Sequence, residues 1–296
     1  MDRKQTDISR REFLRRMGIG AGSAFALTIL DPLRAFSQEP RTADEPVRMT
    51  YRVQHGSGEQ ISLLGFGMMR LPNDQDEVNR LVDYAIAHGV NYFDTAPVYM
   101  GGESEVLTGN ALARHPRERF YVATKMSNQG GDQSMERCKA MYETSMKKLR
   151  VDYIDYYLLH SVGGGGMDAL NRRFFDNGLL DFLLNEREAG RIKHLGFSYH
   201  GDVRVFDWLL DHQELYHWDF CQIQMNFLDW RHAGQKRGRR GGDADAEYLY
   251  NKCEKTGVQC VIMEPLRGGA FGRMAPELSD RLKAVHPDDS TARWAF

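Results

Sequence analysis

The sequence is poor in cysteine, and its few cysteines are not spaced as they are in most metal clusters. The four, Cys138, Cys221, Cys253 and Cys260, contain no Cys-x-x-Cys pair. Zinc and iron–sulfur sites are commonly built from such closely spaced pairs. We therefore expect no metal. Cys221 and Cys260 lie in apolar runs that read as strands, so buried thiols are the expected state.

Neither sign of charge is in excess. Lys and Arg number 39 and Asp and Glu number 41, which gives a net charge of −2. Nucleic-acid-binding domains usually carry a basic face, and this balance gives no reason to expect such a partner. Hydrophobic residues make up 42% of the 296 residues, so the chain can bury a sizeable core.

Long apolar runs are scarce as well, and the notable one lies near the N-terminus. Met17–Leu30 contains no charged residue but is short for a bilayer span. It follows Ser9-Arg10-Arg11-Glu12-Phe13-Leu14 and precedes Ala35-Phe36-Ser37, a small-x-small cleavage site. This order predicts a twin-arginine signal peptide over residues 1–37. An amphipathic N-terminal helix or a retained anchor are the alternatives.

The predicted signal peptide implies export to the periplasm by the twin-arginine translocase, which carries folded proteins. Residues 38–48 are polar and contain proline, and we interpret them as a linker. Residues 49–296 then form the folded domain, beginning with a small hairpin made by Met49–Gln54 and Gln60–Leu64.

After the hairpin, short apolar strands alternate with amphipathic helices. We expect strands at Ser62–Gly67, Asn91–Asp94, Phe120–Thr124, Tyr153–Leu159, His194–Ser198, Phe220–Met225 and Gln259–Met263. Helical periodicity covers Glu77–His88, Met135–Leu149, Leu179–Glu188, Val205–His212 and Ala246–Lys255. Such alternation is typical of a parallel sheet, and this many units favours a (β/α)8 TIM barrel over an open sheet.

The eighth unit of that barrel is not evident. Seven strands are predicted, and Ser290–Phe296 looks like the middle of a helix without a cap. A barrel lacking one strand would expose two unpaired edges. We therefore expect the sequence to be part of a longer protein.

Polar side chains follow three successive predicted strands. Asp94 ends the second strand and Tyr99 lies in its loop, Lys125 ends the third, and His160 ends the fourth. In a barrel the carboxyl ends of the strands surround one mouth, where active sites lie. We therefore expect an acid, a phenol, an amine and an imidazole to converge there.

These four groups suit the reduction of a carbonyl. Hydride addition to carbon puts negative charge on oxygen, which Tyr99 would protonate. A nearby ammonium lowers the pKa of a phenol, and Lys125 would serve so. Asp94 would hold Lys125 and keep it charged, and His160 would orient the carbonyl. Taken singly, an Asp, Lys or His at a strand end is usually a cap, a surface charge or a satisfied polar group, and it is the set of four that points to chemistry.

Several motifs resemble those of the aldo-keto reductases. They are Leu64-Gly65-Phe66-Gly67, Phe93-Asp94-Thr95-Ala96-x-x-Tyr99 with Gly102-Glu103-Ser104-Glu105, Ala189–Ser198, Phe220–Asn226, and Glu264-Pro265-Leu266-x-Gly268-Gly269. The resemblance implies a catalytic tetrad of Asp94, Tyr99, Lys125 and His160. It also implies a nicotinamide cofactor, with NADP favoured over NAD, and a small carbonyl substrate.

The same resemblance implies a set of cofactor contacts. Ser198 and Gln224 match the positions that bind the nicotinamide carboxamide, and Met263 stands where the family often stacks an aromatic ring. The loop contacts are Gly67, Met68, Met69, Leu266 and Gly268. Tyr199 replaces the usual Asn after Ser198, a departure that weakens one carboxamide contact.

Two further interpretations concern partners. Some relatives of this family are nicotinamide-binding regulatory or partner subunits without turnover of their own, and this is the alternative to an enzyme. An exported enzyme would also need a supply of reduced cofactor. It would either leave the cytoplasm with cofactor bound and cycle between paired substrates, or be served by a redox partner.

Overall fold

The computed structural model describes residues 49–232 and 244–295. The predicted signal peptide (1–37) and linker (38–48) lie outside the described residues. The strands are β1 (Tyr51–Val53), β2 (Gln60–Ser62), β3 (Phe66–Gly67), β4 (Tyr92–Asp94), β5 (Tyr121–Met126), β6 (Ile154–Val162), β7 (Ile192–Tyr199), β8 (Phe220–Gln224) and β9 (Gln259–Met263).

The longer helices are α3 (Gln75–Ala87), α4 (Ser104–Leu112), α5 (Met135–Leu149), α7 (Leu179–Glu188), α8 (Val203–Asp211), α11 (Ala246–Thr256) and α12 (Pro276–Lys283). Shorter ones are α6 (Gly166–Leu170), α9 (Gln213–Tyr216) and α10 (Asp229–His232). Among the single turns are η1 (Met68–Arg70), η2 (Tyr99–Gly102), η4 (Asn171–Phe175) and η7 (Arg293–Ala295).

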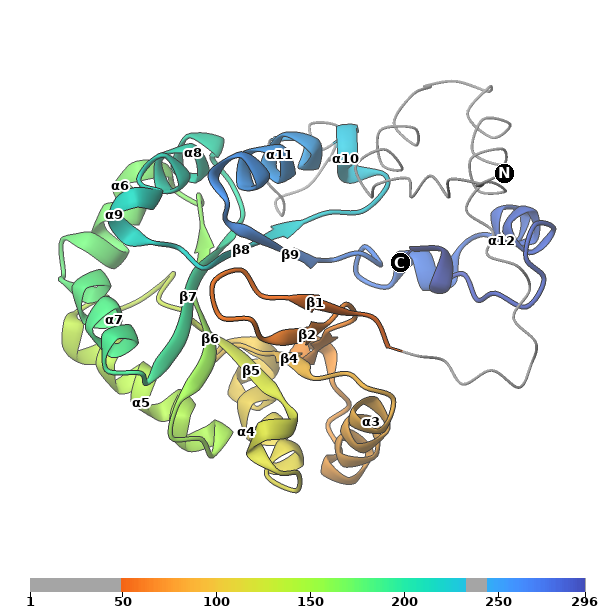
Figure 1. Cartoon of the computed structure of the whole chain (residues 1–296), viewed down its shortest axis with the longest axis horizontal. Helices are drawn as coiled ribbons and strands as arrows, with labels where there is room; N and C mark the ends of the chain where they lie inside the picture. The colour runs from red at the N-terminus through yellow and green to blue at the C-terminus, as the bar shows by residue number, and fades with distance from the viewer. Residues whose placement is uncertain (1–48, 233–243, 296) are drawn as a thin grey trace, which may run out of the picture.

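Strands β3 to β9 form one parallel, seven-stranded sheet whose spatial order is the order of the chain. The sheet curls, and an arc of helices from α3 to α11 surrounds it (Figure 1). This confirms the predicted fold, a (β/α)8 TIM barrel with seven of its strands present in the described residues. Strand β6 runs to Val162, three residues beyond its predicted end, and its register with β7 shifts between Leu159 and Val162.

Side chains on the two faces of the strands build two apolar layers. Because successive strand residues point to opposite faces, alternate positions enter the barrel. Tyr156 stands in the interior with its ring 5.1 Å from each of the rings of Tyr92 and Phe220. On the outer face, residues such as Tyr157 and Phe197 are buried against the helices. The interior is therefore a packed core, as in other barrels of this type.

Helix α4 was not predicted, because its apolar residues do not form a stripe. Buried positions instead surround it, among them Ser104, Glu105 and Thr108. Gly109 permits its close approach to α5, since a Cβ at this position would lie 2.1 Å from the Lys148 carbonyl oxygen. The helix is thus held by tertiary packing rather than by its own sequence pattern.

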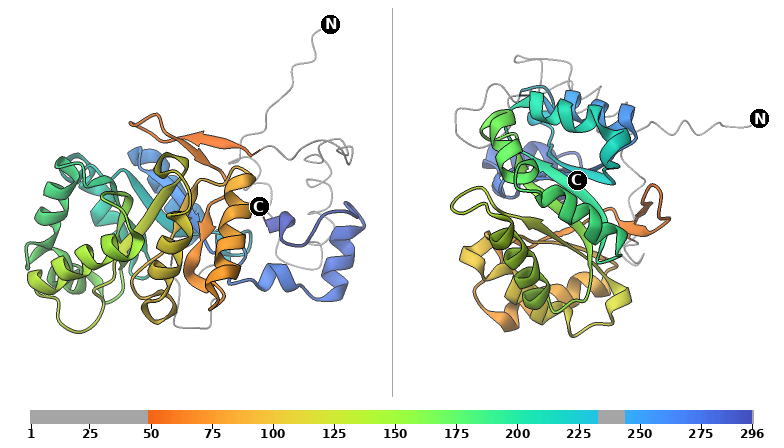
Figure 2. Two further views of the ribbon diagram at one scale, coloured as in Figure 1. Left: turned by 90° about the horizontal axis from the view of Figure 1, so that it is seen from below. Right: turned by 90° about the vertical axis from the view of Figure 1, so that its left-hand side faces the viewer.

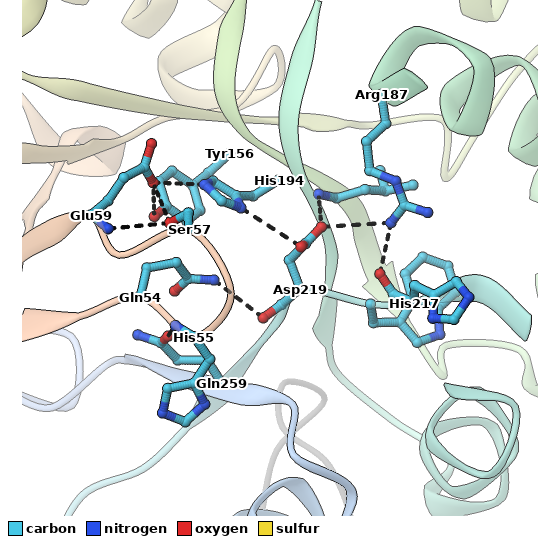
Figure 3. A network of polar contacts seen from close by, with 12 residues as sticks. Gln54, His55, Ser57, Glu59, Tyr156, Arg187, His194, His217, Asp219 and Gln259 are labelled. Carbon is cyan, nitrogen blue, oxygen red and sulfur yellow. Dashed lines mark hydrogen bonds and ion pairs between the residues drawn. The ribbon is translucent and has the colours of Figure 1, made fainter. Parts of the chain in front are cut away.

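The predicted hairpin is confirmed, with β1 and β2 antiparallel. Its turn reaches the start of the barrel strands through a polar network (Figure 3). Glu59 Oε2 lies 2.6 Å from His194 Nε2, and the other ring nitrogen of this histidine, Nδ1, lies 3.7 Å from Asp219 Oδ1. Burial alone would lower the pKa of His194, but Asp219 and Glu59 outweigh burial and raise it. The network ties the hairpin to β7 and to the residue before β8.

The segment after β9 departs from the helical arc. Helix α12 stands outside it (Figure 2) and buries none of its residues. The stretch from Ser290 was expected to be helical, but within the described residues it contains only the turn η7. No helix within 49–232 or 244–295 has both the length and the apolar character needed to cross a membrane.

Candidate active site

The ends of β4 and β5 bring an acid and an amine into direct contact. Lys125 Nζ lies 2.5 Å from Asp94 Oδ1 and donates a second hydrogen bond, of 2.7 Å, to the Thr95 carbonyl. The Lys125 side chain is buried and Asp94 is 15% exposed on its side chain. A buried ammonium requires such partners, because an unpaired charge is costly away from water.

Tyr99 follows Asp94 in the turn η2, where the backbone is unusual. Met100 has φ of +53°, a left-handed conformation that few non-glycine residues adopt. The Tyr99 ring centroid lies 5.0 Å from Lys125 Nζ and 5.9 Å from the His160 ring, which it meets edge-on. The structure thus brings together all four residues that the sequence placed at the barrel mouth.

Two residues of the Gly102–Glu105 motif, Ser104 and Glu105, form hydrogen bonds with the residues next to Asp94 and Lys125. The Ser104 hydroxyl contacts Thr95 Oγ1 at 2.7 Å and donates to the Met68 carbonyl at 2.7 Å. Glu105, which is buried, accepts a 2.7 Å hydrogen bond from Thr124, the residue before Lys125. The motif therefore fixes the backbone on both sides of the Asp94–Lys125 pair.

The electrostatics of Lys125 and Tyr99 are set by burial and by each other. Burial lowers the pKa of Lys125, but Asp94 and Tyr99 outweigh it and the pKa is raised. For Tyr99 the expected lowering of the pKa by Lys125 is present, but the net direction is upward. Burial raises the pKa of the phenol, and Lys125 lowers it by less. Tyr99 is therefore a protonated phenol across neutral pH.

His160 is neutral and held from one side. Burial, followed by the charges of Lys125, His200 and Arg173, lowers its pKa well below the ordinary value. Its Nδ1 lies 2.5 Å from the Ser127 hydroxyl. Because Ser127 engages Nδ1, the nitrogen that remains for another group is Nε2.

One residue in contact with this centre was missed by the sequence analysis. Gln222 Nε2 donates a 3.1 Å hydrogen bond to Asp94 Oδ2, the carboxylate oxygen not used by Lys125. Gln224, which was chosen instead, donates to Asp229 at 2.9 Å. Gln222 and Gln224 lie on the same face of β8, because they are two residues apart in a strand. Strand alternation therefore offered Gln222 as a candidate, but only the position of Asp94 in the folded chain shows that Gln222 contacts this centre.

The residues expected to hold a cofactor have different surroundings. Ser198 is buried, and its hydroxyl accepts a hydrogen bond from the Ser161 amide at 2.8 Å. Met68 has its side chain fully in the core, whereas Gly67 and Met69 are exposed. A Cβ on Gly67 would meet nothing within 4 Å, so the space beside this strand end is open.

The loop after β9 contributes the other expected contacts. Met263 ends β9 and is partly exposed, as is Leu266, and Gly268 has φ of +66°. An ion pair of 3.0 Å between Arg70 and Glu264 joins this loop to the one after β3. The Ser198 hydroxyl, the Gln224 amide and the open position at Gly67 thus lie at the carboxyl ends of parallel strands, on the same side of the barrel. These groups fit a nicotinamide dinucleotide.

Tyr199, the departure noted in the sequence, belongs to a different layer from Ser198. Its ring packs against Phe206, with centroids 5.0 Å apart, and its hydroxyl donates to the Gly201 carbonyl. The side chain is buried in the layer between sheet and helices. The tyrosine therefore serves packing.

Comparison with known proteins identifies the family. The profile of the Aldo/keto reductase family matches residues 63–289. The chain belongs to this family. The probable aldo-keto reductase 1 of Glycine max is 37% identical over 48% of this chain and 42% of its own length. The L-galactose dehydrogenase of Arabidopsis thaliana is 32% identical over 55% of this chain and 52% of its own length. The chain thus spans about half the length of these relatives.

Solved aldo-keto reductases share the fold. The holo form of aldo-keto reductase AKR11C1 from Bacillus halodurans has a TM-score of 0.63 and 24% identity, covering 84% of this chain and 81% of the other. An aldo/keto reductase from Brucella melitensis has a TM-score of 0.60 and 23% identity, covering 83% and 82%. At these identities the likeness supports the fold alone.

Proposed function

We propose that this aldo-keto reductase reduces an aldehyde or ketone with a nicotinamide cofactor, NADPH in preference to NADH, and that Tyr99 is the proton donor. The observation that carries the proposal is the convergence of Tyr99, Lys125, Asp94 and His160 at one mouth. When bound, the nicotinamide supplies a hydride to the carbonyl carbon.

The chain supplies the proton and the environment that makes its transfer possible. Tyr99 Oη gives its proton to the substrate oxygen as negative charge develops there. Lys125 Nζ stabilises the phenolate left behind, and Asp94 keeps the ammonium in place. His160 is neutral, and in the tautomer whose Nδ1 accepts from the Ser127 hydroxyl its Nε2 donates a hydrogen bond that would orient the carbonyl.

The cofactor would lie along the mouth between β3 and β9. Ser198 and Gln224 would bind the carboxamide, and Met263 would pack on the ring as a polarisable thioether. Gly67 and Met69 would line one side, together with the backbone of Met68, whose side chain is in the core. Leu266 and Gly268 would line the other. The open space at Gly67 supports this placement.

Replacing Tyr99 by Phe tests the proposal. The variant is expected to lose about 10²–10⁴-fold in kcat while its affinity for NADPH is kept, because only the acid is removed. Turnover is measured by NADPH consumption with a panel of small aldehydes, and by oxidation of L-galactose, since one relative is named for that activity. Tyr84→Phe, on the exposed face of α3, is the control.

Two outcomes would refute the assignment. Unchanged turnover in Tyr99→Phe would remove Tyr99 from the chemistry. Tight NADPH binding without turnover of any carbonyl by the wild-type protein, together with a co-purifying partner, would favour a nicotinamide-binding partner subunit instead.

We further propose that the full chain is exported to the periplasm by the twin-arginine translocase. The support is the Ser9–Leu14 motif with the uncharged Met17–Leu30 run and the Ala35-Phe36-Ser37 site. Cell fractionation of the chain and of an Arg10→Lys/Arg11→Lys variant tests export, and periplasmic wild-type protein with retained variant is expected. Mass spectrometry of the exported protein then distinguishes bound nucleotide from dependence on a redox partner.

A further inference from the structure

Strand β6 does not end regularly at His160. The register with β7 shifts between Leu159 and Val162, and Ser161 has φ of +54°. Such a bulge adds a residue to one strand and changes the direction of its side chains. Here it lies at the residue that meets Tyr99. A non-glycine residue in this conformation is strained and persists only where its surroundings hold it.

Arg173 holds the bulge from the π-helical turn η4. Its guanidinium donates to the carbonyl oxygens of His160 and Ser161, the latter at 3.2 Å. Its Nε donates to Asn128 Oδ1 at 3.1 Å, and Asn128 returns a hydrogen bond of 2.9 Å to the Arg173 carbonyl. From the other side, Ser198 accepts from the Ser161 amide. Both backbone groups of Ser161 are thereby fixed.

The charge of Arg173 is not balanced. The side chain is nearly fully buried, with the residue 4% exposed, and no carboxylate in the described part of the chain forms an ion pair with it. Its hydrogen-bond partners are neutral, and the guanidinium lies 4.6 Å from the Phe174 ring. Burial lowers its pKa to about 10, so it still carries its charge at neutral pH.

Burying an unpaired cation is costly, and a neutral side chain could hold two carbonyls at lower cost. The guanidinium makes three hydrogen bonds, all to neutral acceptors, so its charge is left to act on neighbouring groups. The group beside it that can respond is His160. After burial, the charges of Lys125 from β5 and Arg173 and the His200 side chain from the loop after β7 all lower the pKa of this imidazole, and the phenol of Tyr99 faces it.

We infer that Arg173 is a positioning residue of the proposed reduction, holding the β6 bulge so that His160 faces Tyr99 and placing a positive charge beside the imidazole. The inference rests on the proposed function for its catalytic consequence. The geometric and electrostatic parts stand without it, because they concern only this chain. Arg173 acts through His160 and is not assigned a contact with substrate.

The test compares Arg173→Met, Arg173→Lys and Arg172→Met. Arg172 is the exposed neighbour in the same turn, so its replacement removes an equal charge without touching the bulge. The His160 imidazole is followed by NMR against pH in the full chain, with its signals assigned from a His160→Gln variant. Turnover with NADPH and an aldehyde is measured in parallel, and circular dichroism checks folding.

In Arg173→Met, we expect His160 to become protonated at a higher pH than in wild type, because a positive charge has been removed. The acid limb of the rate profile should move to higher pH by the same amount. We also expect kcat to fall about 10–100-fold with NADPH affinity within about twofold, as for a catalytic group displaced by about an ångström. Arg172→Met should match wild type in both measurements.

Arg173→Lys keeps the charge but loses the planar fork. In Arg173→Lys the NMR titration of His160 should match that of wild type, while kcat should still fall. This variant provides the test if Arg173→Met does not fold. An unchanged His160 titration in Arg173→Met, or in Arg173→Lys an unchanged kcat, would overturn the inference. If no variant or wild type turns over any carbonyl, the proposed function fails, and the NMR titration still decides the role of Arg173.

Discussion

Replacing one member of the buried Lys125–Asp94 pair should destabilise the protein about as much as replacing both. The charged atoms lie 2.5 Å apart on side chains that are 1% and 15% exposed. At an effective dielectric constant of about 20 their attraction is about 6–7 kcal/mol before the cost of desolvation. Either Lys125→Met or Asp94→Asn leaves one buried charge uncompensated, which costs about 3–5 kcal/mol.

The double variant removes both charges, so neither is left unpaired. It is expected to lose about as much stability as one single variant, which gives a coupling free energy of about 3 kcal/mol or more. Urea unfolding of wild type, both single variants and the double variant, followed by circular dichroism at pH 7, measures this directly.

The Lys252–Asp211 pair is a matched control. Its atoms are also 2.5 Å apart, but the side chains are 20% and 58% exposed. Its coupling free energy in the corresponding cycle, Lys252→Met with Asp211→Asn, should be below about 1 kcal/mol because water screens the charges. Additive single effects at Lys125 and Asp94, or equal coupling in the two pairs, would show that burial does not govern the interaction.

Two further predictions concern stability elsewhere in the barrel. The pKa of His194 is raised in the folded state, so its stabilising effect is complete below the unfolded value of about 6.5 and is lost as pH rises through the folded value. The Tm difference between wild type and His194→Gln should thus be larger at pH 6 than at pH 9; a difference independent of pH would contradict this. Gly109→Ala should lower the free energy of unfolding by about 1–3 kcal/mol or more, because the added Cβ would lie 2.1 Å from the Lys148 carbonyl oxygen. Gly130→Ala is the control, since a Cβ there meets nothing within 4 Å, and it should change the free energy of unfolding by less than about 0.5 kcal/mol. Equal effects of the two substitutions in urea unfolding would refute the packing argument.

Local patterns were sufficient to predict the strands of the barrel. Short apolar runs separated by helical periodicity are a property of neighbouring residues, and parallel strands follow from their alternation. Helix α4 was not predicted because its buried residues do not form one apolar stripe but face several neighbouring elements. A helix that contacts β-strands and other helices on many sides has no periodic signature to detect.

The positions of the catalytic candidates were also readable, but not all of their properties. Asp94, Lys125 and His160 lie at or near the carboxyl ends of successive strands, so the topology alone brings them to one mouth. The raised pKa of Tyr99 depends on burial, which is a property of the folded molecule. Gln222 and Gln224 look equivalent along the chain, and only the facing residue, Asp94 or Asp229, distinguishes them.

By itself, therefore, the sequence determined the family, the order of the strands and the four residues at the mouth, because these follow from local pattern and chain order. The tertiary structure decided the bulge at Ser161, the unbalanced charge of Arg173 behind His160 and the sign of the Tyr99 pKa shift. Each of these three features depends on groups distant in sequence and on the exclusion of water, and none of them can be read before the chain has folded.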